Sequence, residues 1–221
     1  MEFEKIHNKG QARLFKNQYV EYLTKTHPLV IWGMYLPVLI LLPYYSYRSL
    51  HFSSTSLSLF FLGGMFFWTL TEYILHRFAF HYHAETERGK KLNYILHGNH
   101  HEYPRDKERL FMPAAPSLII ASVLFLLMYL VLRKNVFPFF PGFMFGYLIY
   151  GSMHYAIHAW NPPFKWMKGL WRNHHLHHYK NDERGFGVSS TLWDHVFGTM
   201  FDLKKEKEDK EKVQQLMFTK K

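Results

Sequence analysis

Residues 116–132 read PSLIIASVLFLLMYLVL and contain no charged side chain. An apolar helix of about 17–25 residues, rising about 1.5 Å per residue, crosses a hydrocarbon core of about 30 Å. A buried helix of a soluble protein normally keeps a polar stripe, which this stretch lacks. The stretch therefore predicts a helix that spans a membrane.

Three further apolar runs have the same length, at Leu29–Tyr47, Thr55–Leu75 and Val136–Ile157. The four runs together carry one acid, Glu72, and no Lys, Arg or Asp. We therefore predict an all-α integral membrane protein with four transmembrane helices. The alternative, four buried helices of a soluble protein, fits these sequences less well because a polar face is missing.

The basic residues predict how these helices face. All 27 Lys and Arg except Arg48, Arg133 and Lys134 lie before the first run, between the second and third runs, or after the fourth. By the positive-inside rule, both termini and the long middle loop are cytoplasmic. The net charge of +10 is then a topology signal, and nucleic acid is not an expected partner. The membrane would be the bacterial inner membrane or the endoplasmic reticulum, depending on the source.

The chain divides into three parts. Residues 1–28 are polar with scattered Leu, Phe and Tyr, which suits an amphipathic helix on the cytoplasmic membrane surface or a loosely packed lead-in. Residues 29–203 hold the four spans and a cytoplasmic helical cap, and residues 204–221 form a charged tail. We expect no cleavable signal peptide, because the first residues are polar.

Composition excludes several classes of protein. Hydrophobic residues make up 48% of the chain and aromatic residues 19%, which excludes an intrinsically disordered chain. The absence of cysteine excludes disulfide scaffolds, iron–sulfur clusters and cysteine-ligated zinc.

Histidine is unusually frequent, and twelve of the 16 histidines fall within 76–101, 154–158 and 174–178. The spacing H-x-x-H-H occurs twice, and positions i, i+3 and i+4 share one face of a helix. His76 and His81 are five residues apart, so they reach one site only if their helix ends or bends between them. Ten histidines fit this pattern: His76, His81, His97, His100, His101, His154, His158, His174, His177 and His178.

Ten imidazoles aimed at one region are best explained as metal ligands, because a divalent metal binds neutral imidazole and offsets the crowding. One metal takes about four to six ligands, so ten nitrogens imply two metals. Hydrolytic zinc, a metal carrier and a pair of redox metals that activate O2 remain open. No H-E-x-x-H motif occurs, and the ligands gather at one face rather than along a path through the spans.

All ten histidines lie at or just outside the predicted cytoplasmic interface. The natural substrate of such a site is a lipid whose chain lies in the bilayer and whose polar end lies at the headgroup level. Chemistry is then expected close to that polar end.

The sequence resembles the fatty acid 2-hydroxylases of the fatty acid hydroxylase and sterol desaturase superfamily. The matching segments are HRFAFH from His76, HGNHHEYPRDKERLFMP from His97, HYAIH from His154, HHLHH from His174 and GFGVSSTLWDHVFGT from Gly185. The resemblance implies that residues 29–203 are the hydroxylase domain and that the same ten histidines are ligands. It implies hydroxylation at C2 of a long acyl chain, either free or as the N-acyl chain of a ceramide-like lipid.

The resemblance also implies two irons, O2 and two electrons per turnover. Many relatives carry a b-type cytochrome domain before the first span, and none is found in this sequence, so the electron donor is expected to be a separate protein. Zinc is expected in purified protein, because an all-nitrogen site binds zinc more tightly than Fe(II). A sterol or carotenoid oxidase, an acyl desaturase and a membrane metal-binding or transport protein remain as alternatives.

Six further residues are candidates for supporting roles. Tyr147 and Tyr150 share a stripe with His154 and His158, so they are candidates to line an acyl channel. Metal-bound histidines usually donate their other N–H to a carboxylate or carbonyl. On that basis the candidates for contacts with the ligands are Asp106, Arg109, Asp194 and His195.

Overall fold

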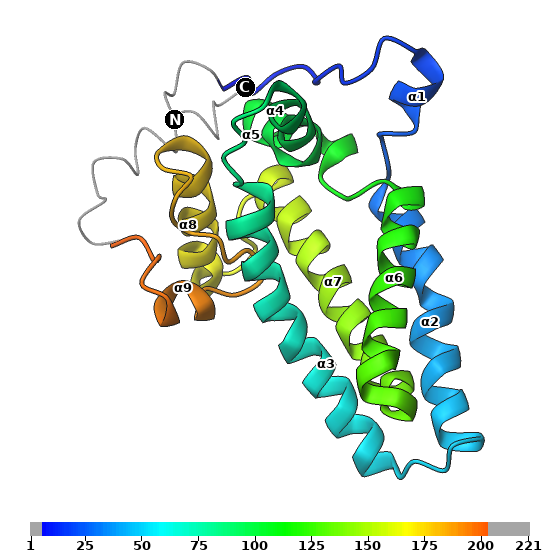
Figure 1. The fold of residues 1–221 in the computed structure, drawn as a ribbon. Coiled ribbons are helices and arrows are strands. Elements are labelled where there is room, and N and C mark those ends of the chain that lie inside the picture. Colours follow the sequence, from blue (N-terminus) through cyan, green and yellow to red (C-terminus); the bar gives the residue numbers. More distant parts are fainter. Residues whose placement is uncertain (1–5, 203–221) are drawn as a thin grey trace.

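The computed structural model describes residues 6–202, and the regular elements among them are all helical. The predicted charged tail, 204–221, lies outside the described residues. Four long helices form the main bundle, which Figure 1 shows as an elongated array. They are α2 (Pro28–Arg48), α3 (Ser54–Ile74), α6 (Ala114–Leu132) and α7 (Val136–Ala159).

Local sequence explains where these helices begin. His27 Nδ1 accepts a hydrogen bond from Leu29 N at 3.2 Å, and Pro28 occupies the first position of α2. Ser53 Oγ caps α3 by accepting from Ser56 N at 3.1 Å. A serine cap and a proline at the first helical position are favoured at helix starts, and each long helix matches its predicted apolar run within about two residues.

Two glycines let α3 and α7 approach closely. A Cβ on Gly64 would lie 2.2 Å from Phe139 O, and a Cβ on Gly142 would lie 1.9 Å from Phe61 O. No other residue type fits there without moving a backbone, and small residues at helix contacts are typical of membrane bundles. α7 also packs against α2, and it forms the centre of the bundle.

The outward faces of the long helices are apolar. On α6, Ile119 is 65% exposed and Val131 is 80% exposed, with no polar face among the described residues of that helix beyond isolated serines. The described residues contain three helical runs that are long and apolar enough to cross a membrane, Pro28–Arg48, Ser54–Phe80 and Lys107–Ala159. The last run includes both α6 and α7, which are joined by the short turn η5 (Arg133–Asn135). The length and apolar character of these helices are consistent with a membrane protein.

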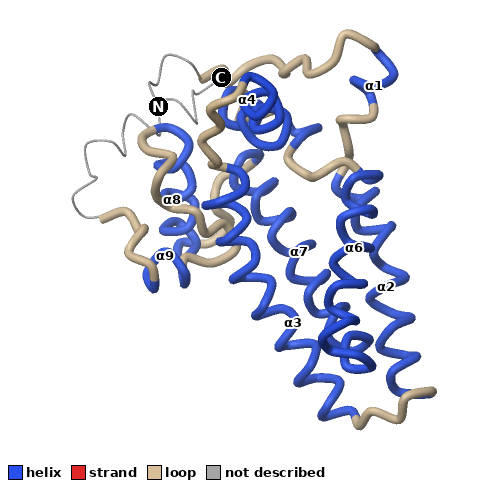
Figure 2. The backbone as a smooth tube through the Cα atoms, viewed as in Figure 1, coloured by secondary structure: helices blue, strands red, loops and turns tan. Residues whose placement is uncertain are grey.

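Short helices and loops gather beside the ends of α3 and α7 that carry the histidines (Figure 2). The π-helical segments are η2 (Leu75–Phe80) and η3 (Tyr94–Gly98), and the 3₁₀ turns are η4 (Lys107–Arg109) and η6 (Lys165–Met167). The short α-helices are α4 (Glu87–Asn93), α5 (Asn99–Glu102), α8 (Lys168–Tyr179) and α9 (Leu192–Val196).

For residues 1–28 the sequence left an amphipathic helix and a loosely packed lead-in open. The described part of this segment, residues 6–27, which we call the N-terminal strap, contains one helical turn, α1 (Gln18–Tyr22), and is otherwise irregular. Side-chain pairing explains why the strap adopts this form instead of a helix. Glu21 pairs with Arg109, Lys25 Nζ donates to Glu108 Oε2 at 2.7 Å, and Thr26 N donates to Glu108 O at 2.8 Å. The strap is therefore fastened to the loop that precedes α6.

Candidate metal centre

The spacing of His76 and His81 is accommodated by a π-helix. At Leu75–Phe80 the chain of α3 continues as η2, and His81 N donates to His76 O at 3.3 Å. A π-helix pairs residue i with residue i+5, so side chains that an α-helix would separate by about 140° face the same side. The sequence required the helix to end or bend between His76 and His81, and the π-helical turn meets this requirement by bringing both side chains to one side.

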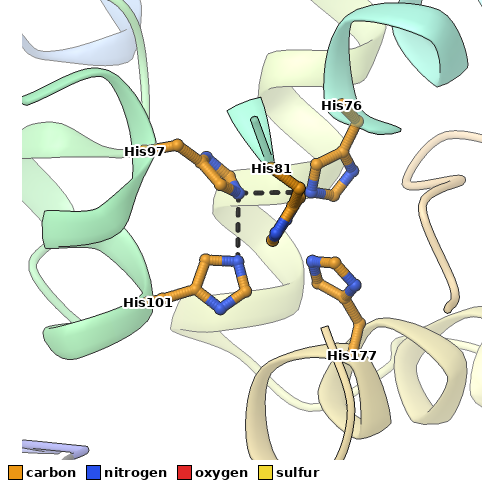
Figure 3. A group of neighbouring side chains, drawn as sticks. All are labelled: His76, His81, His97, His101 and His177. Atoms are coloured by element: carbon orange, nitrogen blue, oxygen red, sulfur yellow. Dashed lines mark hydrogen bonds between the residues drawn. The ribbon is translucent and has the colours of Figure 1, made fainter. Parts of the chain in front are cut away.

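The ten candidate ligands form two groups, within each of which one ring nitrogen per residue lies within 4.8 Å of all the others. Cluster A consists of His76, His81, His97, His101 and His177 (Figure 3). Cluster B consists of His100, His154, His158, His174 and His178. The structure thus brings together the ten residues that spacing selected, five around each centre.

The two H-x-x-H-H motifs each contribute to both clusters. His97 and His101 belong to cluster A, whereas His100 between them belongs to cluster B. His174 and His178 belong to cluster B, whereas His177 belongs to cluster A. In each motif the first and last histidines, at i and i+4, therefore belong to the same cluster. The histidine at i+3 points toward the other cluster, because positions i+3 and i+4 differ by about 100° around the helix.

The ring nitrogens of cluster A face one another, and there are too few N–H protons for every nitrogen to take part in a hydrogen bond. His97 Nε2 lies 3.2 Å from His76 Nε2 and 3.0 Å from His101 Nε2 (Figure 3). The buried Nε2 atoms of His81 and His177 have no hydrogen-bond partner. A neutral imidazole has one N–H, so a nitrogen facing two others can donate to one of them at most. Converging lone pairs of this kind fit a cation.

Cluster B has the same character. His174 Nε2 lies 3.0 Å from His158 Nε2 and 3.2 Å from His178 Nε2. The buried Nε2 atoms of His100 and His154 have no hydrogen-bond partner. All five side chains of this cluster are buried, so water does not satisfy these nitrogens. Nitrogen ligands in this number suit zinc or iron.

In several candidate ligands, the ring nitrogen that points away from the cluster makes a contact that fixes the orientation of the ring. Nδ1 of His76 pairs with Phe186 O at 2.5 Å, and Nδ1 of His177 pairs with Arg184 O at 2.7 Å. A ring that donates Nδ1–H to a carbonyl keeps the Nε2 lone pair for a metal. His81 Nδ1 lies 3.7 Å from Asp182, a carboxylate that the sequence analysis did not select. The proximity of His81 lowers the pKa of Asp182, so the carboxylate is ionised at neutral pH.

Burial keeps the cap histidines neutral. It lowers the pKa of His97, His100 and His101 well below the usual range, and the neighbouring imidazoles lower it further. The same holds for the α8 ligands, His174, His177 and His178. Neutral imidazole is the form that binds a metal, so the pocket favours the ligand state.

The four predicted supporting residues have other partners in the structure. Arg109 Nη1 donates to Asp106 Oδ2 at 2.5 Å, and the other arm of the guanidinium pairs with Glu21. Neither Asp106 nor Arg109 therefore contacts a candidate ligand directly. The side chain of His195 pairs with Thr191 O at 2.8 Å and is exposed. Asp106, Arg109 and His195 therefore hold loops in place and do not orient the candidate ligands.

Asp194 is buried and acts one step away from the ligands. Its Oδ1 accepts from Phe186 N at 3.0 Å, and Phe186 O in turn pairs with His76. Sequence reasoning did not assign a role to Glu72, which is 3% exposed and accepts from Val188 N at 2.8 Å in the same loop. A lone acid in an apolar membrane run was the signal that would have identified it.

A cavity of about 450 Å³ connects the clusters with the interior of the bundle. One end is lined by His97, His100 and His154, and the remainder is mainly apolar side chains of α3, α6, α7 and the strap. Tyr147 and Tyr150 lie in its wall, at the place that their spacing on α7 suggested. Tyr147 OH lies 3.3 Å from Ser117 Oγ, and the Tyr150 ring stacks on His154.

A second pocket, of about 590 Å³, reaches cluster A from the opposite side. It is lined by His81, His97 and His101 together with polar residues such as Asp182, and its wall includes the exposed ring of Tyr82. Its lining contains no ligand of cluster B. Cluster A therefore borders on the polar pocket and, through His97, on the apolar cavity, whereas cluster B borders on the apolar cavity alone.

Comparison with known proteins gives one family. The family model described as "Fatty acid hydroxylase" matches residues 61–199. A dihydroceramide fatty acyl 2-hydroxylase of Arabidopsis thaliana is 35% identical over 194 residues, which cover 87% of this chain and 81% of that protein. A ceramide very long chain fatty acid hydroxylase of Saccharomyces cerevisiae is 39% identical over 199 residues, and a human fatty acid 2-hydroxylase is 31% identical over 211 residues.

The yeast and human matches cover 87% and 85% of this chain but 50% and 56% of those proteins, so the chain spans about half their length. A solved structure, full-length scs7p with only the hydroxylase domain visible, is similar with a TM-score of 0.80 and 37% identity. That similarity covers 87% of this chain and 73% of the solved chain.

Proposed function

This chain belongs to the fatty acid hydroxylase family, a family of hydroxylase enzymes, and we propose that it hydroxylates C2 of a long acyl chain with O2 at a di-iron centre. The electrons come from a separate donor protein. The four long helices cross the membrane four times, with both termini and the histidine clusters on the cytoplasmic side. The relatives described as acyl and ceramide hydroxylases support the reaction.

One observation carries the proposal: the apolar cavity ends at ligands of both clusters. His97 belongs to cluster A, His100 and His154 belong to cluster B, and all three lie in the cavity wall. An acyl chain in this cavity places the carbons next to its polar end against the histidines. C2 is the carbon adjacent to the carbonyl, so the geometry favours oxidation at that position.

The residues of the chain contribute position and environment. The ten imidazoles would hold two irons, which when bound supply the activation of O2. The Nδ1 contacts to Phe186 O and Arg184 O fix the orientation of His76 and His177. The apolar wall excludes water, and Tyr147 and Tyr150 shape the channel beside His154.

The charges around the cavity favour a neutral acyl group over an ionised free acid. Arg109 lines the cavity, but its guanidinium is already paired with Asp106 and Glu21. Glu72 also lines the cavity and would repel a carboxylate. An amide-linked N-acyl chain carries no charge, so a ceramide-like lipid is the better substrate.

The test is lipid mass spectrometry of cells with and without this protein, grown under 18O2 with a competent electron donor. We expect one 18O atom at C2 of an acyl chain, mainly in an amide-linked lipid. Loss of two hydrogens without added oxygen would instead indicate a desaturase. Label in a sterol or carotenoid would indicate an oxidase of that class. Uptake of metal into vesicles without O2 consumption would indicate a metal transport protein.

A further inference from the structure

A single loop, residues 184–189, contacts cluster A through its backbone carbonyls. Phe186 O pairs with His76 Nδ1 at 2.5 Å, and Arg184 O pairs with His177 Nδ1 at 2.7 Å. The Phe186 ring also lies against His76, His81 and His177, with centroids 5.7, 5.7 and 5.6 Å away. Three of the five ligands of cluster A are therefore positioned by this loop.

Two buried carboxylates bind the other side of the loop. Asp194 accepts from Phe186 N at 3.0 Å and from Gly187 N at 2.8 Å. Glu72 accepts from Val188 N at 2.8 Å and from Ser189 N at 2.9 Å, and the Ser189 hydroxyl donates to its second oxygen. Four consecutive backbone N–H groups are thus bound in two pairs. A Cβ on Gly187 would lie 2.1 Å from Ser190 O and 2.8 Å from Asp194 Oδ2, which explains the glycine.

Glu72 is also placed to respond to a cation in cluster A. It lies on α3 one turn before His76, is 3% exposed, and its three donors are two backbone N–H groups and one hydroxyl. A buried carboxylate without a charged partner is costly. The ten imidazoles of the clusters are neutral ligands, so two divalent ions would leave an excess of positive charge that a nearby anion offsets.

We propose that Glu72 is a positioning residue for cluster A: together with Asp194 it holds loop 184–189 so that the loop carbonyls fix His76 and His177, and its charge stabilises the bound metal. The proposal rests on the metal site of the proposed function and is independent of which lipid is oxidised. Among the described residues, no hydrogen bond joins this loop to a ligand of cluster B, so we expect the effect to be specific to cluster A.

The first measurement uses the metal-free, full-length protein in detergent and follows deuterium exchange of the peptide that covers 185–190. We expect the four amides of 186–189 to be protected in the wild type, and those of Val188 and Ser189, which Glu72 binds, to exchange faster in Glu72→Ala. Glu72→Gln keeps an acceptor for the two backbone N–H groups and can donate to the Ser189 hydroxyl, so its protection should stay near that of the wild type. Equal exchange rates of these amides in the wild type and in Glu72→Ala would refute the proposed role of Glu72 in holding the loop.

The second measurement counts zinc per chain after equilibration with a competing chelator. We expect Glu72→Ala to weaken one of two sites by roughly 10–100-fold, as loss of a group that orients a ligand does. Glu72→Gln should weaken the same site less, through loss of charge alone. Glu87→Gln is the matched control, because Glu87 is exposed and pairs with Lys90 at 2.8 Å instead of with the loop.

Double variants show which of the two clusters contains the weakened zinc site. In a His177→Ala background, which already damages cluster A, Glu72→Ala should weaken zinc binding no further. In a His100→Ala background, which leaves cluster A intact, Glu72→Ala should weaken the remaining tight site. Additive losses in both backgrounds would indicate a general folding defect and overturn the proposal. Wild-type zinc affinity in Glu72→Ala would overturn it too, whereas a wild type without zinc affinity would overturn the metal site itself.

Discussion

His177 and His100 belong to different clusters, so their substitution tests the two centres separately. We expect His177→Ala and His100→Ala each to abolish hydroxylation and to weaken metal binding in one cluster, while the protein still inserts into membranes. Product analysis and metal counting check this. His51→Asn is a suitable control, because His51 lies in the α2–α3 turn with a φ of 57° that asparagine tolerates. Normal turnover in either alanine variant would contradict its assignment as a ligand.

The all-nitrogen ligand sets determine which metal is found after purification. Zinc(II) binds such sites more tightly than iron(II), so protein purified in air without added iron should contain zinc and be inactive. Elemental analysis and turnover before and after anaerobic reloading with Fe(II) test this. Hydroxylation at the full rate by the zinc form would be incompatible with redox chemistry at the clusters.

At the scale of helices, the contact between α3 and α7 depends on glycine. Gly142→Ala places a Cβ 1.9 Å from Phe61 O, a backbone atom that cannot rotate away. Overpacking of this kind costs about 1–3 kcal/mol, so the thermal unfolding midpoint in detergent should fall. Gly33→Ala on α2 is the control, since a Cβ there meets nothing within 4 Å. An unchanged unfolding midpoint for Gly142→Ala would show that α3 and α7 can move apart without loss of stability.

The boundaries of the long helices could be predicted from sequence, but the form of some elements could not. Apolar run length is a local feature, and it placed α2, α3, α6 and α7 within about two residues. The π-helix at Leu75–Phe80 has no comparable local signal beyond the spacing of His76 and His81. For the strap the sequence left a surface helix and a loosely packed lead-in open. It could not decide between them, because the pairing with Arg109 and Glu108 joins residues more than 80 positions apart.

At the scale of the molecule, the two clusters differ in access. Cluster A borders on the polar pocket and includes His81, whose side chain is 12% exposed, whereas all five residues of cluster B are buried. We therefore expect a soluble chelator to remove metal in two phases, with cluster A released first. The fast phase should be missing in His177→Ala and present in His100→Ala. A single phase in the wild type would show that both centres open together.

The sequence by itself determined that the protein is helical and apolar enough for a membrane, and it selected the ten histidines, because helix periodicity and hydropathy are properties of neighbouring residues. The division of those histidines into two centres was decided by tertiary structure. Cluster A joins residues from η2, η3, α5 and α8, and cluster B joins residues from α5, α7 and α8. Which segments meet depends on how distant helices pack, and the cavity and the contact of Glu72 with loop 184–189 arise only from that packing.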